Sequence, residues 1–320
     1  MSILRGMRLR LVLDAILFSL VVNTTTQGAS AQTVTLTPSP VIAGSPVLIR
    51  IDAPQSTDVE GEWRGEKLQF FRSASVADPA QQAWYALAGT DVEASPGSTQ
   101  MTLHLTGPAA SSGTATGTRP LTQTFTQTVV IEPTHYHSAT LTVAPGFVEP
   151  SPTAQQQIAV ERTLKDRIFS ISRSRALWSG RFLAPVNAQP TDSFGTRRTF
   201  NGKLASIHKG MDFRARSGTP VRAANAGLVV LAQPLYFEGN CIVIDHGLGL
   251  YTLSMHLSRI DVKEGEPVEK GELIGLSGAT GRATGPHLHW AVRWHSAYLD
   301  PQKLLKLNLP ETPGSTARSD

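Results

Sequence analysis

The sequence contains little that would cross-link the chain or bind a polyanion. Its 320 residues include one cysteine, Cys241, and the formal net charge is +4. A single cysteine excludes an internal disulfide, and zinc sites built on cysteine need several thiolates. Because Cys241 lies in the apolar run NCIVID, we expect a buried structural thiol. The charge is too small to indicate a nucleic-acid-binding protein.

Long apolar runs are absent beyond the N-terminus, where residues 1–31 resemble a secretory signal peptide. Three arginines precede the apolar residues 11–22, and the sequence ASA ending at Ala31 fits a cleavage site. Asp14 interrupts the apolar stretch and leaves an uncleaved anchor as the alternative. No later stretch reaches the ~18 apolar residues of a membrane span. We therefore predict an exported protein that is periplasmic, extracellular or bound in the cell envelope, with no stable membrane span after cleavage.

Residues 32–143 have the alternation of an all-β domain. The run MTLHLT beginning at Met101 alternates apolar and polar residues, and proline and glycine separate such runs. Short strands over about 110 residues predict a β-sandwich with its aromatic residues in the core. His135 and His137 close this segment. With no aspartate or cysteine nearby, we interpret them as surface residues.

Residues 144–184 are expected to form a linker and one helix between two domains. The helix is predicted over residues 153–174 from apolar residues at every fourth position. These residues are Val160, Leu164 and Ile168. Regularly spaced glycines and short strands predict a second, mostly β domain over residues 185–305. The polar residues 306–320 are expected to be a disordered tail.

The histidines concentrate in the second domain. In TGPHLHWAV, residues 284–292, His287 and His289 occupy alternate positions of an expected strand. Side chains two residues apart in a strand face the same side. Taken alone, such a pair is explained more simply as the polar face of a half-buried strand than as a metal site.

A second motif, HKGMD, places His208 four residues before Asp212. On a straight strand the two would lie ~13 Å apart, too far to share one ion with bonds of ~2 Å. Joint ligation therefore requires a bend, which Gly210 permits. The alternative is an exposed histidine followed by a turn-forming aspartate. The run YTLSMHL places His256 on the polar face of another strand, whereas His246, in the turn-like DHGLG, is interpreted as structural.

Together these motifs resemble peptidase family M23, the lysostaphin-type or LytM-type zinc endopeptidases of peptidoglycan. HxxxD is followed by GNxxxIDHG, by a strand ending in HL, and by SGxTGxxTGPHLH. DSFGTRR at 192–198 and YLDPQKLL at 298–305 also match, so the resemblance covers residues 185–301. One variation is LSMHL, where the family more often has Tyr-Ala or Tyr-Gly before the histidine.

The resemblance implies a C-terminal antiparallel β peptidase domain that binds one Zn²⁺ per chain. The implied zinc ligands are His208, Asp212 and His289. The implied catalytic pair is His256, which would stabilise the oxyanion, and His287, which would accept the proton of the attacking water. More weakly, residues 32–143 resemble the immunoglobulin-like modules that precede such peptidases, with a role in targeting, spacing or autoinhibition.

The expected activity is hydrolysis of peptide cross-links, with peptidoglycan peptide stems as the partner. The sequence indicates no particular oligomeric state. Two alternatives stay open: a catalytically silent LytM-type regulator that activates a cell-wall amidase, and a zinc-loaded wall-binding module without turnover.

Overall fold

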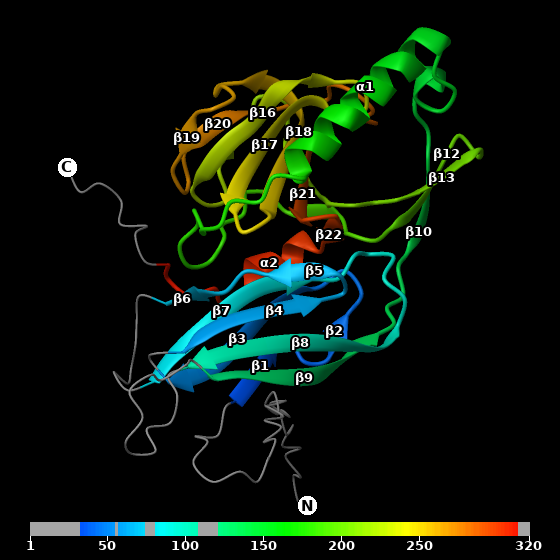
Figure 1. Cartoon of the computed structure of the whole chain (residues 1–320). Helices are drawn as coiled ribbons and strands as arrows, with labels where there is room; N and C mark the ends of the chain where they lie inside the picture. The colour runs from blue at the N-terminus through cyan, green and yellow to red at the C-terminus, as the bar shows by residue number, and fades with distance from the viewer. Residues whose placement is uncertain (1–32, 55–56, 74–80, 108–120, 313–320) are drawn as a thin grey trace, which may run out of the picture.

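The computed structural model describes residues 33–54, 57–73, 81–107 and 121–312. The proposed signal peptide lies outside them. Two β-rich lobes lie one above the other, and α1 (Pro152–Phe169) runs along the outer side of the upper, C-terminal lobe (Figure 1). The prediction of a mainly β chain is confirmed. Among the described helices, none has the length and apolar character that a membrane crossing requires.

The N-terminal lobe is a sandwich of two sheets. One sheet has the order β1 (Thr33–Thr37), β3 (Pro46–Pro54), β7 (Gln81–Gly89), β6 (Phe71–Arg72). The other has the order β2 (Val41–Ile42), β9 (Leu121–Glu132), β8 (Gly97–Gly107), β4 (Asp58–Trp63), β5 (Glu66–Leu68). Alternate residues of β3 and β8, such as Ile49 and Leu103, are fully buried and belong to one core. This arrangement is the expected one for strands with a single apolar face.

The C-terminal lobe is built on one ten-stranded antiparallel sheet. Its main path is β11 (Pro190–Asp192), β14 (Met211–Phe213), β21 (Leu288–Trp294), β18 (Leu250–Ile260), β17 (Gly239–Gly247), β16 (Gly227–Leu235), β19 (Pro267–Val268). Beside this path, β15 (Pro220–Arg222) pairs with β20 (Leu273–Ser277), β20 also pairs with β18, and β22 (Ala297–Leu299) pairs with β21. The long strands β17 and β18 are buried along most of their length.

A small sheet and direct contacts connect the two lobes. The strand β10 (Ser138–Leu141) falls within the range predicted for the sandwich, but it pairs in parallel with β12 (Arg197–Phe200), which pairs with β13 (Leu204–Ile207). A Cβ on Gly89 of the N-terminal lobe would lie 2.3 Å from the Leu299 side chain of the C-terminal lobe. The lobes therefore pack closely instead of being joined by the linker alone.

The helix α1 begins where the sequence predicts but ends earlier. The hydroxyl of Ser151 accepts a hydrogen bond from the Ala154 amide, and proline occupies the first helical turn. The helix ends at Phe169 instead of Ser174, because the following chain turns onto the sheet. There, the Ile171 carbonyl accepts the Tyr251 hydroxyl, and Arg173 reaches Asp245 at 2.8 Å.

The prediction of a disordered tail from residue 306 is wrong as far as Thr312. The short helix α2 (Pro301–Lys306) is capped by Asp300, and Leu307 and Leu309 after it are buried. Thr312 donates its hydroxyl hydrogen to the Trp178 carbonyl at 2.5 Å. Apolar residues at 307 and 309 therefore anchor a segment whose composition alone suggested disorder. Residues 313–320 lie outside the described residues.

His246 is structural, as predicted. Its ring is fully buried, with Nδ1 2.7 Å from the Ala226 carbonyl and Nε2 2.8 Å from the Thr252 hydroxyl. Because a carbonyl only accepts, Nδ1 carries the hydrogen and Nε2 accepts one from Thr252. Cys241 is also buried and free, as expected.

Acid should destabilise the protein through His246. Burial lowers the pKa of His246 to about 4, below its ordinary value of 6.5. Between these values the unfolded chain binds a proton that the folded chain does not, so stability is lost as the pH falls from 6.5 towards 4. The loss is on the order of 3 kcal/mol. Unfolding in urea at pH 7 and pH 4.5 measures it. His246→Gln should be less stable at pH 7 but less sensitive to pH, and identical pH slopes would contradict this.

Candidate active site

The centre of the candidate site is set by strand pairing in the C-terminal lobe. In the pair β14–β21, Asp212 lies directly opposite His289, and in the pair β18–β21, Met255 lies opposite His289. Directly opposed residues project from the same face. As a result, Oδ1 of Asp212 lies 2.9 Å from Nδ1 of His289.

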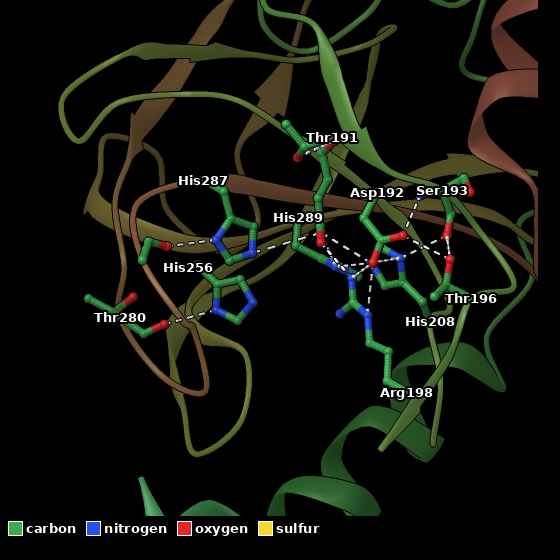
Figure 2. A network of polar contacts seen from close by, with 12 residues as sticks. Thr191, Asp192, Ser193, Thr196, Arg198, His208, His256, Thr280, His287 and His289 are labelled. Carbon is green, nitrogen blue, oxygen red and sulfur yellow. Dashed lines mark hydrogen bonds and ion pairs between the residues drawn. The ribbon is translucent and has the colours of Figure 1, made fainter. Parts of the chain in front are cut away.

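His208 reaches this pair from the bend between β13 and β14. Its amide donates to the Thr196 carbonyl at 2.8 Å, and its Nδ1 lies 3.0 Å from the Ser193 carbonyl. The carbonyl requires the hydrogen on Nδ1, so Nε2 has the free lone pair. Nε2 lies 3.1 Å from Asp212 Oδ1 and 2.9 Å from His289 Nδ1. Figure 2 shows the side chains of His208 and His289 pointing to one spot beside Arg198.

The three donor atoms fit a metal ion. They form a nearly equilateral triangle with sides of 2.9 to 3.1 Å, and tetrahedral ligands ~2 Å from zinc lie roughly 3.3 Å apart. Two imidazoles and one carboxylate are a donor set that zinc accepts, and three protein ligands leave a fourth position open. His208, Asp212 and His289 form a group that could hold one ion.

Charge within the group is also suited to a cation. Burial opposes ionisation of Asp212, but the hydrogen bonds of His208 and His289 outweigh it and hold the pKa of this carboxyl well below its usual value. Burial lowers the pKa of His289 to about 4. At neutral pH the carboxylate is therefore charged and the His289 ring is neutral, as metal ligation requires.

The second carboxylate oxygen of Asp212 is held by an arginine that sequence reasoning missed. The Arg198 guanidinium lies 2.6 Å from Asp212 Oδ2, and it also binds Asp192 at 2.5 Å. Arg198 lies on β12 and Asp192 on β11, in the segment DSFGTRR that matched the family. Such contacts orient a ligating carboxylate. The adjacent Arg197 and Arg198 were the feature of the sequence that could have indicated such a residue. Their spacing did not indicate which acidic side chain either would bind.

Gly210 matters for a different reason from the one predicted. A Cβ on Gly210 would lie 2.4 Å from Nε2 of His289 and 2.7 Å from the Trp290 carbonyl. Its backbone is not in the left-handed region. Glycine is therefore needed here because the backbone just before β14 approaches the His289 ring closely, and not because of a special dihedral angle.

We expect Gly210→Ala to weaken metal binding on the order of 10–100-fold, the range seen when a residue that orients a metal ligand is lost. The methyl group would push the His289 ring or the β21 backbone away. Competition with a zinc chelator measures the affinity. Gly146→Ala is the control, since its Cβ would make only an ordinary contact of 3.6 Å with Tyr236. Equal zinc affinity in the two variants would contradict the prediction.

His256 and His287 lie beside the metal group. Their ring centroids are 4.9 Å apart, and that of His256 is 5.9 Å from that of His289. Nδ1 of His256 lies 2.8 Å from the Thr280 carbonyl, and Nδ1 of His287 lies 2.8 Å from the Gly285 carbonyl (Figure 2). Both rings therefore carry the hydrogen on Nδ1 and present a bare Nε2. Nε2 of His287 is 3.8 Å from Asp212 Oδ1.

The backbone at His256 departs from the alternation expected from the sequence. Its φ is 60°, in the left-handed region that a histidine rarely occupies, and the strand register shifts just after Leu257. The amide of His256 donates to the Glu238 carbonyl at 2.8 Å. His256 is only 7% exposed and lies in the cavity wall. Burial lowers the pKa of His256 to about 3, so the ring is neutral at neutral pH.

These groups line a cavity of about 950 Å³. Most of its wall comes from the C-terminal lobe, but Glu93 of the N-terminal lobe and Leu141 and Val143 near β10 also line it. Lys209 forms an ion pair with Glu93 at 3.4 Å. No residue of α1 lines the cavity. The helix nevertheless packs beside the site, on the face of the sheet that carries His289. Phe169 contacts Tyr251 and Arg293 on this face, and Lys165 forms an ion pair with Glu238 of the cavity wall.

Comparisons with known proteins agree with this geometry. Residues 206–301 match peptidase family M23. The peptidoglycan DD-endopeptidase ShyA of Vibrio cholerae is 43% identical over 108 residues, 34% of this chain and 24% of the relative. The DD-carboxypeptidase/endopeptidase Mpg of Neisseria meningitidis is 42% identical over 95 residues, 30% and 22% of the two chains. The match thus spans about a quarter of the length of these curated relatives.

The fold has a counterpart among solved structures. A structure named as an M23 peptidase of Pseudomonas aeruginosa aligns with a TM-score of 0.58 and 24% identity. The alignment covers 83% of this chain and 95% of the other, so the likeness in fold extends beyond the C-terminal lobe. The family match covers residues 206–301, and the converging side chains of His208, Asp212 and His289 lie within this range. We conclude that this part of the chain is a peptidase domain of family M23.

Proposed function

We propose that this protein is a zinc-dependent endopeptidase that hydrolyses peptide cross-links of bacterial peptidoglycan. The observation that carries the proposal is the complete group of five side chains at one cavity. Three donor atoms converge within 3.1 Å of one another, and two imidazoles present bare nitrogens beside them. The relatives named as peptidoglycan endopeptidases support the substrate class.

The metal and the two free histidines have separate tasks in this proposal. A zinc ion held by His208, Asp212 and His289 would lower the pKa of a water molecule and polarise the peptide carbonyl. Nε2 of His287 lies on the open side of the group, 3.8 Å from Asp212 Oδ1. It is placed to accept the proton of the attacking water and to return it to the leaving amine.

The second histidine can stabilise negative charge only after it gains a proton. Nδ1 of His256 already donates to the Thr280 carbonyl, so a neutral ring has no hydrogen on Nε2 to offer. The attacking water has two protons. His287 would take the first, and His256 would take the second as the tetrahedral intermediate forms, which would convert His256 into a donor to the developing oxyanion. Both protons would then pass to the leaving amine, so that the products are a carboxylate and an ammonium group. We therefore propose that His256 and His287 both begin as proton acceptors, and that His256 becomes the oxyanion donor later in the cycle.

Arg198 and Asp192 would act by positioning. Arg198 binds Asp212 Oδ2 at 2.6 Å, which leaves Oδ1 facing His208 and His289. A carboxylate held in this way presents one oxygen to the metal and cannot rotate to present the other. The proposed export of the protein to the cell envelope, based on residues 1–31, would bring the site to its substrate.

The test is digestion of purified sacculi, followed by mass spectrometry of the released muropeptides. The proposal requires that cross-linked dimers be converted into monomers, and that a chelator stop the reaction and zinc restore it. A silent regulator would bind zinc and release nothing alone, but would stimulate an added amidase. A wall-binding module would bind sacculi without releasing any fragment. Absence of new amine termini in the digest would therefore rule out the endopeptidase.

A further inference from the structure

Arg282 stands in the wall of the catalytic cavity on a loop with a fixed backbone. The loop between β20 and β21 is closed by a bridge between Gly278 and His287. The Arg282 amide donates to the Phe237 carbonyl at 2.9 Å. The Thr280 hydroxyl accepts from the Asn240 amide at 2.9 Å and donates to the Leu257 carbonyl at 2.8 Å. The same loop carries His287, so Arg282 has a set position relative to the catalytic group.

The guanidinium of Arg282 is held by aromatic rings. Its central carbon lies 4.5 Å from the centroid of Phe237 and 4.7 Å from that of Phe200. Cation–π contacts of this kind orient a guanidinium without occupying its hydrogen-bond donors. Across the described ranges, no group accepts a hydrogen bond from this guanidinium or forms an ion pair with it. Its five N–H donors are thus available to a ligand in the cavity.

The other charged groups near Arg282 have ion-pair partners of their own, and within the described structure only Oε2 of Glu238 among their buried oxygens has no hydrogen-bond partner. Glu238 is the acid that interacts with it electrostatically, and Arg198 is the neighbouring base. Glu238 forms its ion pair with Lys165 of α1, and Arg198 binds Asp192 and Asp212. Arg282 is therefore a half-buried cation in the active-site wall that lacks a counter-ion of its own.

We propose that Arg282 binds a carboxylate of the peptide substrate and makes the enzyme prefer substrates that carry this charge. A guanidinium pairs with a carboxylate through two parallel hydrogen bonds, which fixes orientation as well as adding affinity. The inference rests on the proposed function, since it assumes that a peptide occupies the cavity. The carboxylate could belong to the end of a peptide stem or to an acidic side chain within it, and the same experiment separates these sources.

The experiment uses three soluble cross-linked peptides that differ only in charge. One has every carboxylate free, one has its terminal carboxylates converted to amides, and one has its side-chain carboxylates converted to amides. Hydrogen bonds to charged groups contribute ~1.5–3 kcal/mol, so the wild-type kcat/KM should fall about 10–100-fold with one of the two amides. The amide that causes the fall identifies the source of the carboxylate.

Arg282→Gln should remove this discrimination. For the peptide with all carboxylates free, the kcat/KM of the variant should fall to the value that wild type shows on the disfavoured amide, mainly through a higher KM. On that amide, the variant should stay within a few fold of wild type. Arg214→Gln is the matched control, because Arg214 is an exposed arginine of the same lobe that does not line the cavity. Zinc content should be unchanged in both variants. A purely structural role for Arg282 would slow the variant equally on all three peptides.

The wild-type measurement decides the question even if Arg282→Gln does not fold. Equal rates on all three peptides would overturn the carboxylate assignment and leave the endopeptidase proposal standing. Unchanged discrimination in a folded Arg282→Gln would also overturn it. If the wild-type protein cuts none of the peptides and none of the sacculi, the proposed function fails and the inference fails with it.

Discussion

Replacing His289 with alanine is expected to remove zinc from the protein and reduce hydrolysis of sacculi to background. The wild-type protein should contain one zinc ion per chain. His289 Nδ1 lies 2.9 Å from each of the other two donor atoms, so its loss leaves two ligands. Loss of a residue that merely orients a ligand already costs ~10–100-fold in metal affinity, and loss of a ligand should cost more. Elemental analysis of the purified variant measures zinc content.

The sequence supplies a matched control for this variant. His137 belongs to a pair, His135 and His137, with the same spacing as His287 and His289. Both residues of that pair are exposed. His137→Ala should keep its zinc and its activity, which separates a specific ligand from a general effect of losing a histidine. Full zinc occupancy in His289→Ala would show that the three-ligand assignment is wrong.

The part of the site that could be predicted is the part governed by strand geometry and motif order. His287 and His289 were expected on one side of a strand, and both side chains do reach the same group from β21 and the residue before it. The bend required between His208 and Asp212 is present as the break between β13 and β14. These features depend on local backbone periodicity, which can be predicted from the pattern of apolar and polar residues.

The rest depended on contacts between segments distant in sequence. Alternation along β18 put His256 on the polar face of the strand, but a left-handed backbone turns its side chain into the cavity. Nothing in the sequence indicates such a backbone angle at a histidine. Arg198 and Arg282 were missed because their partners are determined by how a hairpin and a loop pack against β14 and the β16–β17 turn. The buried residues Leu307 and Leu309 were missed for the same reason. Their burial depends on tertiary packing, which the amino-acid composition of the segment does not predict.

Variants of the catalytic pair should differ from variants of the zinc ligands in one respect: they should keep zinc but lose catalytic rate. His287→Ala and His256→Gly are each expected to lose ~10²-fold or more in kcat, as is typical for removing a general base or an oxyanion donor. Glycine is the appropriate replacement at 256, because the φ of 60° there would strain alanine but not glycine. Zinc analysis and steady-state kinetics on one soluble cross-linked peptide measure both quantities.

The double variant tests whether the two imidazoles act together. If His287 receives the proton and His256 uses a proton from the same water, removing both should cost little more than removing one, since groups that act as a unit are strongly non-additive. Independent roles would instead give losses that multiply. Leu288→Ala is the control on a neighbouring position, because Leu288 is fully buried in the core and does not line the cavity. Its loss should lower stability more than kcat. If His287→Ala lost zinc as completely as His289→Ala, the division between ligand and catalyst would be wrong. Nδ1 of His287 is bound to the Gly285 carbonyl, so Nε2 of His287 would then have to be a zinc ligand.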